Sequence, residues 1–281
     1  EAAPDIHIHA FSPLEVTHGA RTLALPLEDY LARLKEAGLS TLPGAAAEIL
    51  DPEVRDIICP DKVTADEWIE VMRVAHGVGL RSTATIMFGH VEEYKHWARH
   101  LLRIRGLQEE TGGFTEFVPL GFVYQEAPLS FMKELKTDSL GPSGHEVLHV
   151  HALARILLGK SFRNIQASWV KEGEKLASLL LTSGCNDLGG TLINESISTA
   201  AGARHGQLLS PSRLRKIIFE AGREPVERST LYKVLKTFTG DNETDDALDK
   251  VENADQLFGS YRALTEAKEN RFVHPNKLSL R

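Results

Sequence analysis

The sequence predicts an α/β fold built on a parallel sheet, with a (β/α)₈ TIM-type barrel favoured over an open sheet. Short β-rich runs alternate with longer helical patterns, as in successive βαβ units. The runs start roughly 36 residues apart, near the ~31 residues per unit of an eight-unit barrel. A doubly wound sheet would show the same alternation, but no G-x-G-x-x-G sequence opens a helix, which weakens that alternative.

Six runs have the length and composition of buried strands. Each is followed by Gly, Pro, Ser or an acidic residue where a βα loop should begin. The runs are Ile6–Phe11, Ser40–Pro43, Ser82–Phe88, Glu116–Phe122, Asn164–Val170 and Asn186–Leu192.

Apolar residues three and four positions apart predict helices between these runs. The stripes are Leu27, Tyr30, Leu31 and Leu34, then Trp68, Val71, Met72 and Ala75, then Trp97, Leu101 and Ile104, and later Leu176, Leu179 and Leu180. A helix is also predicted over Glu146–Leu158, and Pro211 should begin another. Asp66 and Ser210 are expected to be N-caps.

Composition narrows the class of protein. The chain is 42% hydrophobic and 25% charged, which is typical of a globular protein. Its net charge of -7 provides no basic footprint for nucleic acid, and no apolar run reaches the ~18–20 residues that cross a bilayer. We expect a cytoplasmic protein whose two cysteines, Cys59 and Cys185, are reduced structural thiols.

Two parts are predicted along the chain. Residues 1–235 should form a barrel-type domain, and residues 236–281, which start with an acidic stretch, a linker with a peripheral helix or tail. Because the chain opens directly on a strand-like run, we expect an N-terminal portion of the barrel to be missing.

Polar side chains in and after the predicted strands are the candidate site, because loops converge at the carboxyl ends of parallel strands. His7 and His9 share one face of a strand, a spacing that fits metal ligands or a hydrogen-bonding wall, and no third ligand is evident. Gln166, Ser168 and Asn186 need partners from an internal network or a polar ligand. The other candidates are Ser12, Glu15, Glu48, Met87, Phe88, Gly89, His90, Tyr124, Trp169, Asp187, Thr191, Asn194 and Glu195.

Three of these features also have a structural interpretation. Trp169 is either a core residue or a platform for a flat substrate. Glu48 either accepts hydrogen bonds from a ribose diol or complements a helix dipole. The Gly189-Gly190 pair either lets a ligand approach the backbone or makes a simple turn.

Several strings together closely resemble one family. They are IHIHAFSPLE at 6–15, LPG at 42–44 with AAEIL at 46–50, TATIMFGH at 83–90, QASWV at 166–170, NDLGGTL at 186–192 and NESIS at 194–198. From about Asp5 to Tyr232 the chain is similar to the FO synthase subunit that transfers the 4-hydroxybenzyl group of tyrosine, in the radical S-adenosylmethionine (SAM) superfamily. Gly121 and Tyr124-Gln125 depart from the family pattern, which expects proline and His-Met there.

The resemblance implies a fold, cofactors and substrates. The six runs would be strands three to eight of a (β/α)₈ barrel, and the C-x3-C-x2-C loop that holds a [4Fe-4S] cluster would lie upstream of Glu1. The intact enzyme would cleave SAM and join a 4-hydroxybenzyl radical from tyrosine to 5-amino-6-(D-ribitylamino)uracil, on the way to the deazaflavin chromophore. A partner FO synthase radical enzyme, fused or separate, is also implied.

The resemblance also assigns roles to the candidate residues. Glu48 and the turn Met87-Phe88-Gly89-His90 match positions that meet SAM, and the polar residues of the last two strands match the substrate end. Substrate contacts are expected at His7, His9, Ser12, Glu15, Tyr124, Gln166, Ser168, Trp169, Asn186, Asp187, Thr191, Asn194 and Glu195. No metal ligand is expected in the chain.

Two alternatives remain open. Radical SAM enzymes of the menaquinone futalosine pathway share several of the strings. A cluster-free binding or scaffold module would keep the barrel wall for a partner. The coding sequence upstream of Glu1 discriminates between an enzyme and a module, because it either specifies C-x3-C-x2-C or does not. A partial barrel should also expose a strand edge at Ile6–Phe11.

Overall fold

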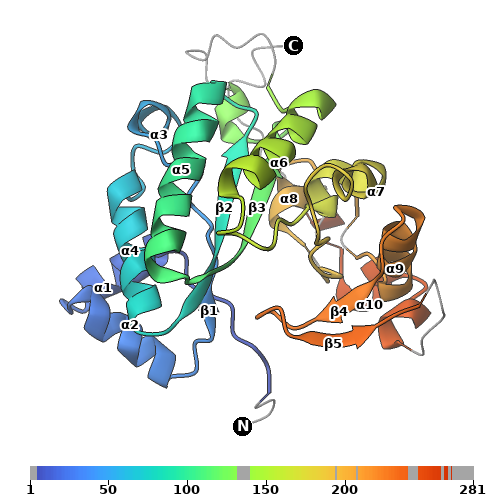
Figure 1. Ribbon diagram of the computed structural model, residues 1–281, viewed down its shortest axis with the longest axis horizontal. Coiled ribbons are helices and arrows are strands. Elements are labelled where there is room, and N and C mark those ends of the chain that lie inside the picture. Colours follow the sequence, from blue (N-terminus) through green and yellow to red (C-terminus); the bar gives the residue numbers. More distant parts are fainter. Residues whose placement is uncertain are drawn as a thin grey trace.

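The central feature of the fold is a parallel sheet. The computed structural model describes residues 5–131, 140–193, 195–206, 208–239, 246–260, 263–264 and 267 (Figure 1). Strands β1 (Thr41–Leu42), β2 (Arg81–Phe88) and β3 (Phe114–Gly121) pair in that order. Single parallel bridges extend the sheet on both sides, joining His9 to Thr41, Phe117 to Ile165, and Gln166 to Asp187.

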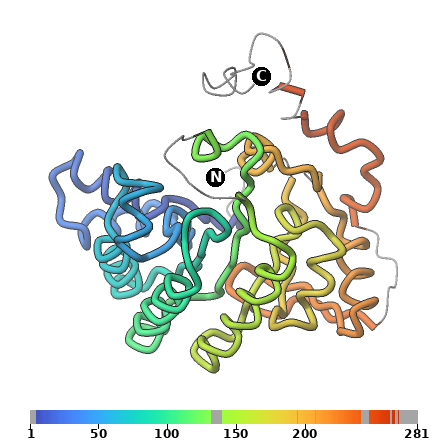
Figure 2. Tube along the Cα trace, turned by 90° about the horizontal axis from the view of Figure 1, so that it is seen from above, coloured from blue at the N-terminus to red at the C-terminus, as the bar shows by residue number. Residues whose placement is uncertain are grey.

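All six predicted runs therefore neighbour one another in sequence order, and every pair is parallel. Parallel neighbours need a crossover between them, and the helices supply it. Figure 2 shows the result as an arc, which passes from the blue N-terminal helices through the green ones to the orange C-terminal part. The predicted α/β architecture with a parallel sheet is confirmed.

Helices cover the outer side of this arc. They are α1 (Pro13–Thr22), α2 (Leu27–Glu36), α3 (Pro52–Ile58), α4 (Ala65–Gly77), α5 (Tyr94–Thr111), α6 (Gly144–Leu158), α7 (Trp169–Leu180), α8 (Ile197–Ala200), α9 (Pro211–Glu220) and α10 (Ala254–Phe258). Two 3₁₀ turns, Pro128–Phe131 and Ala247–Lys250, lie in the connections. No helix in these described ranges combines the length and hydropathy that crossing a bilayer requires.

The two faces of the strands differ in chemistry. Ala84, Ile86 and Phe88 of β2 are fully buried in the core with α4 and α5. Thr83 and Thr85 alternate with them on the inner face, where both hydroxyls bond the backbone of Gly44 at 2.7 Å. A Cβ at Gly44 would lie 2.7 Å from the Thr83 carbonyl oxygen, so only glycine allows the two strands to approach here.

A C-terminal hairpin was not predicted. Strands β4 (Val226–Arg228) and β5 (Val234–Thr237) pair antiparallel, and Tyr232 between them has a positive φ of 62°. The predicted domain boundary after residue 235 falls inside β5. Phe238, immediately after β5, is buried under the guanidinium of Arg215 on α9.

Several predicted boundaries need correction. The N-cap of α4 is Thr64 instead of Asp66, because Thr64 and Glu67 cap each other's backbone N–H groups. Ser210 caps α9 as predicted. The run Asn164–Val170 ends as a strand before Trp169, where α7 begins and turns the Trp169 side chain into the core. Ile6–Phe11 and Asn186–Leu192 form single bridges rather than full strands.

Candidate functional site

The inner face of the strands is the candidate site because it is polar. A TIM-type barrel usually fills its interior with branched apolar side chains. Here Thr83 and Thr85, then Glu116, Gln166 and Asp187, occupy the positions that alternate with core residues. A surface of this kind can bind a polar ligand or form an internal hydrogen-bond network.

A network forms around the buried carboxylate of Glu116. Gln166 Nε2 donates to Glu116 Oε2 at 3.0 Å, and the Tyr232 hydroxyl donates to the same oxygen. Arg228 donates from Nε and Nη2 to the two oxygens of Asp187, at 2.5 and 2.9 Å, and Nη2 lies 3.6 Å from Glu116 Oε2. The hairpin thereby supplies one cation and one hydroxyl to two carboxylates of the sheet.

The pKa shifts in this network follow from burial and charge. Burial raises the pKa of Glu116, which Tyr232 and Arg228 only partly oppose. The pKa of Tyr232 is also raised, by burial first and then by the negative charges of Asp187 and Glu116. For Arg228, hydrogen bonds and charge attraction from Asp187 outweigh desolvation, so its pKa is raised and the guanidinium stays charged.

The predicted histidine pair meets at Thr41. His7 Nε2 and His9 Nδ1 each lie 2.7 Å from Thr41 Oγ1, so both rings do share one face of the segment. Burial lowers the pKa of His9, and His7 lowers it further. Neither ring is part of a group of potential metal ligands in the described residues.

A cavity of about 1320 Å³ brings several predicted residues together. His9, Gln166, Asp187 and Thr191 line it, and Arg228 of the hairpin closes one wall. Ligand sites usually have volumes of roughly 300–1000 Å³, so this space can hold a molecule of cofactor size together with water.

The turns after β1 and β2 hold the residues expected to meet SAM. Glu48 has a left-handed φ of 45° and receives Lys62 Nζ at 2.7 Å, while its carbonyl accepts the Met87 N–H at 2.9 Å. Gly89 donates to Glu92 at 2.5 Å and has a φ of 89°, close against Pro142. The backbone of both turns is therefore fixed by the sheet, and the Glu48 carboxylate is already ion-paired.

His90 is engaged within its own turn. Val91 N–H donates to Nδ1 at 2.8 Å, and Nε2 lies 3.0 Å from the Met87 carbonyl oxygen, which gives the neutral ring a proton on Nε2. Burial lowers the pKa of His90, which agrees with this neutral form, so the 3.0 Å approach of Nδ1 to Glu92 is not an ion pair.

Other predicted residues serve the fold. Ser12 and Glu15 form the capping box of α1, and Glu195 accepts the Ser198 N–H at the start of α8. Asn186 is bound to Arg155, Ile165 N–H and Asn164. Phe88 and Trp169 are 0% and 1% exposed in the helix-facing core, so the core interpretation of Trp169 describes its ring in this structure.

Three further positions complete the comparison with the sequence. The Ser168 hydroxyl makes no hydrogen bond to other described residues, although Ser168 is the N-cap of α7. Tyr124 is 41% exposed beside Gly141. Asn194 lies outside the described residues.

Sequence reasoning missed two residues at the carboxyl end of the sheet. Lys171 Nζ lies 3.1 Å from Ser198 Oγ and forms no ion pair within the described ranges, and burial lowers its pKa. Burial raises the pKa of Glu172 to about 7, with its Oε1 3.3 Å from the donating Gly121 N–H. The signal that could have found them is a Lys-Glu pair directly after a buried strand.

The two cysteines do not fit an iron–sulfur cluster. Such a cluster needs at least three thiolates close together. The chain has two, Cys59 at the end of α3 and Cys185 beside the inner sheet, and both are buried. Burial raises the pKa of each thiol, which disfavours the thiolate that a metal requires.

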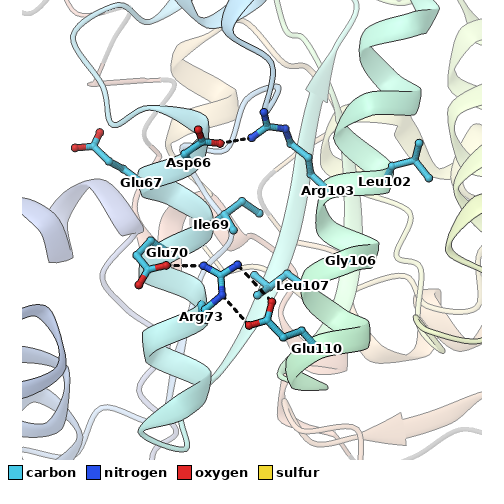
Figure 3. Close-up of a pocket in the computed structure, with 10 residues that line it drawn as sticks. All are labelled: Asp66, Glu67, Ile69, Glu70, Arg73, Leu102, Arg103, Gly106, Leu107 and Glu110. Carbon is cyan, nitrogen blue, oxygen red and sulfur yellow. Dashed lines mark hydrogen bonds and ion pairs between the residues drawn. The ribbon is translucent and has the colours of Figure 1, made fainter.

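Two surface features are ion-pair clusters instead of sites. Asp51, Glu53 and His96 come within metal-binding distance of one another, but Arg99 reaches both acids at 3.1–3.2 Å. A groove of about 810 Å³ between α4 and α5 is shown in Figure 3, where Arg73 meets Glu70 and Glu110, and Arg103 meets Asp66. The arginines of both features are paired with acidic residues, so neither feature offers them to a ligand.

Comparison with known proteins gives a consistent family. The profile described as "Radical SAM superfamily" matches residues 4–104, and the profile "CofH/MqnC C-terminal region" matches residues 111–239. The solved structure of methylornithine synthase (PylB) aligns with a TM-score of 0.49 at 19% identity, covering 76% of this chain and 63% of that one.

Curated relatives are named 5-amino-6-(D-ribitylamino)uracil–L-tyrosine 4-hydroxyphenyl transferase. Those of Methanopyrus kandleri, Methanocaldococcus jannaschii and Archaeoglobus fulgidus are 50%, 51% and 50% identical over 84%, 83% and 82% of this chain. The chain spans 63%, 64% and 65% of their respective lengths. Two adjoining profiles and half-identical relatives agree: the chain is similar to proteins of the radical SAM superfamily and to those described by the CofH/MqnC C-terminal region.

Proposed function

We propose that this chain is the substrate-binding wall of a radical SAM transferase that joins the 4-hydroxybenzyl group of tyrosine to 5-amino-6-(D-ribitylamino)uracil, in deazaflavin biosynthesis. The names of the half-identical relatives support this assignment. The six parallel segments would then be strands three to eight of a (β/α)₈ barrel. The observation that carries the proposal is the polar inner face around the large cavity.

The inner face fits these substrates in chemistry. A ribityl chain, a uracil ring and an amino acid all need several fixed hydrogen-bond partners. His9 Nε2 and the hydroxyls of Ser168 and Thr191 make no hydrogen bonds to the rest of the described chain, so they remain available to a ligand. Glu48 and the backbone turn at Gly89 and His90 would meet SAM.

This chain cannot itself hold the cluster that the superfamily uses. We therefore propose that its thiolate ligands come from sequence other than these 281 residues, in the same polypeptide or in a separate one. A partner FO synthase radical enzyme, fused or separate, would complete the pathway. A cytoplasmic location agrees with soluble substrates of this kind.

The related futalosine-pathway activity is the second candidate, because the matching profile is described for both CofH and MqnC. The two activities use different acceptors. Direct binding therefore separates them.

Isothermal titration of the 281-residue chain with 5-amino-6-(D-ribitylamino)uracil tests the proposal, with uracil as the control ligand. The ribityl compound should bind and uracil should bind far more weakly. Ser168→Ala should weaken binding about five- to tenfold, the equivalent of one hydrogen bond. Ser178→Ala, farther along α7, is the matched control and should bind as the unaltered chain does. Equal affinity for the two ligands would contradict the proposal.

Turnover is tested in a longer protein. If the coding sequence before residue 1 specifies C-x3-C-x2-C, that protein, loaded with iron and sulfide and reduced, should form 5′-deoxyadenosine from SAM when tyrosine is supplied. A cluster-loaded preparation without tyrosine-dependent turnover would overturn the assigned activity.

A further inference from the structure

Two histidines of the first segment share one hydroxyl on the neighbouring strand. His7 Nε2 and His9 Nδ1 are each 2.7 Å from Thr41 Oγ1, and Thr41 is 1% exposed. A hydroxyl has one proton, so it donates to one ring and accepts from the other. When both rings are neutral, one and only one of these two ring nitrogens carries a proton. The tautomers of His7 and His9 are therefore coupled.

The two histidines at the ends of the His7–Thr41–His9 series of hydrogen bonds face different surroundings. His9 lines the cavity of about 1320 Å³, and His7 does not. His7 Nδ1 and His9 Nε2 make no hydrogen bond to any residue that the structure describes. His9 Nε2 is thus available to a ligand in the cavity, and His7 Nδ1 is available to water.

We infer that His7, Thr41 and His9 form a proton relay between a ligand in the cavity and water on the other side of Thr41. His9 Nε2 accepts a proton from an N–H or O–H group of the ligand, and its Nδ1 proton passes to Thr41 Oγ1. The Thr41 hydroxyl proton passes to His7 Nε2, and His7 releases its Nδ1 proton to water. One proton has moved, both rings have changed tautomer, and no bond between heavy atoms has been made or broken.

The charges around the relay keep it in the neutral state from which it can accept a proton. Burial and the neighbouring His7 lower the pKa of His9, and β1 contributes no charged side chain. Across the cavity, Asp187 is paired with Arg228, and Arg215 with Asp249. The other charged residues on the cavity wall are Arg155, Arg223, Glu224, Glu227, Lys236 and Asp246.

The relay deepens the proposed function and rests on it for the identity of the ligand. Tyrosine brings a phenol and an ammonium group, and the acceptor brings amino and ring N–H groups. The phenol, the ammonium group and the ring N–H groups are weak acids of the kind that His9 Nε2 can deprotonate, whereas the neutral amino group is not. Thr41, which no sequence pattern singled out, becomes a positioning and proton-carrying residue.

The coupling is measurable in the 281-residue chain without any cofactor. Ring ¹⁵N chemical shifts at a pH where both rings are neutral report the protonated fraction of His7 Nε2 and of His9 Nδ1. Adding the ribityl compound, which can reach His9 in the cavity but not His7, should change the His9 fraction. In the unaltered chain and in Thr41→Ser, the His7 fraction should then change by an equal and opposite amount. In Thr41→Val, which keeps the shape but removes the hydroxyl, the His7 fraction should stay constant while circular dichroism shows an unchanged fold. A His7 fraction that does not follow His9 in the unaltered chain, or that follows it in Thr41→Val, would overturn the relay.

Turnover of the longer, cluster-loaded enzyme provides the second measurement. Thr41→Val should lower turnover about 10²-fold, the scale of general acid–base catalysis, and Thr41→Ser should retain it. If the tautomers are coupled in the unaltered chain but Thr41→Val keeps full turnover, the reaction does not use the relay. Coupled shifts in a cluster-loaded protein that never turns over would refute the proposed function and leave the relay supported.

Discussion

The Glu172 carboxyl has an unusually high pKa for an acidic side chain. This carboxyl lies against the backbone of Gly121, where a Cβ would come within 2.6 Å of Oε1, so a side chain at position 121 would displace the carboxyl. Burial is the largest influence and raises the pKa to about 7, while the Gly121 N–H and Lys171 oppose the shift. The Gly121 N–H and the space beside it therefore fix the position of the Glu172 carboxyl.

The stability of the fold should reflect this carboxyl. Its pKa is about 7 in the folded chain and near 4.5 when unfolded, so the folded state binds the proton more tightly. This contribution is complete below pH ~4.5 and is lost as the pH rises to ~7. Glu172→Gln should remove ~1–3 kcal/mol of that pH dependence in urea unfolding between pH 4.5 and 8. Glu174→Gln, at a surface ion pair with Arg213, is the control of equal charge. Parallel stability curves for Glu172→Gln and the unaltered chain would contradict the shift.

Single residues also show where sequence reasoning succeeds and fails. The spacing of His7 and His9 correctly placed both rings on one face, because strand alternation is a local property. Ser12 and Glu15 have the spacing of a capping box and form one, while their contact with a substrate stays a prediction. Arg228 could not be predicted, because it meets Asp187 from 41 residues away and no local pattern encodes that contact.

At the scale of elements, the hairpin β4–β5 is held by charge more than by apolar contact. Val234 and Leu235 are 60% and 56% exposed, so its apolar residues contribute little burial. Arg228 instead donates two hydrogen bonds to Asp187, and its guanidinium lies 4.0 Å from the Tyr232 ring centroid. The orientation of the cavity wall therefore depends on one buried ion pair.

Asp187→Asn should release this hairpin. The substitution keeps the shape of the side chain but removes the charge that receives two hydrogen bonds from Arg228, and Glu116 at 3.6 Å is then its remaining anionic neighbour. The loss should cost about 1–3 kcal/mol. Urea unfolding should show the loss, and limited proteolysis should cut first between β4 and β5. Glu227→Gln, on an exposed position of β4, should change stability by less than about 0.5 kcal/mol. An Asp187→Asn chain as stable and as protease-resistant as the unaltered one would show that apolar packing holds the hairpin.

The elements themselves were largely predictable. Three of the six predicted runs contain the parallel strands β1, β2 and β3, the other three contribute isolated parallel bridges, and the helical stripes of α2, α4 and α5 match the observed helices. Strand ends were less predictable, because a run such as QASWV is equally compatible with a strand and with the start of a buried helix. Trp169 begins helix α7 instead of ending a strand because its ring packs in the core, and that packing depends on tertiary contacts.

At the scale of the whole molecule, the arc of parallel segments has an apolar margin. Segment 6–11 pairs with β1 on one side, and no described residue pairs with its other side. Ile6, Ile8 and Phe11 on this segment are 68%, 43% and 42% exposed. Unpaired backbone beside exposed apolar side chains is a template for association with another chain.

The purified 281-residue chain should therefore self-associate through this margin. Sedimentation velocity over a concentration series should show oligomers that form as concentration increases. Ile6→Lys places a charge on the edge, the device by which natural sheets prevent such pairing, and should shift the chain toward monomer. Ile156→Lys on α6 is the matched control: Ile156 is 75% exposed but lies on a helix, where a new charge should leave association unchanged. A monomer at every concentration, or equal effects of the two lysines, would show that residues 6–11 do not act as an open edge.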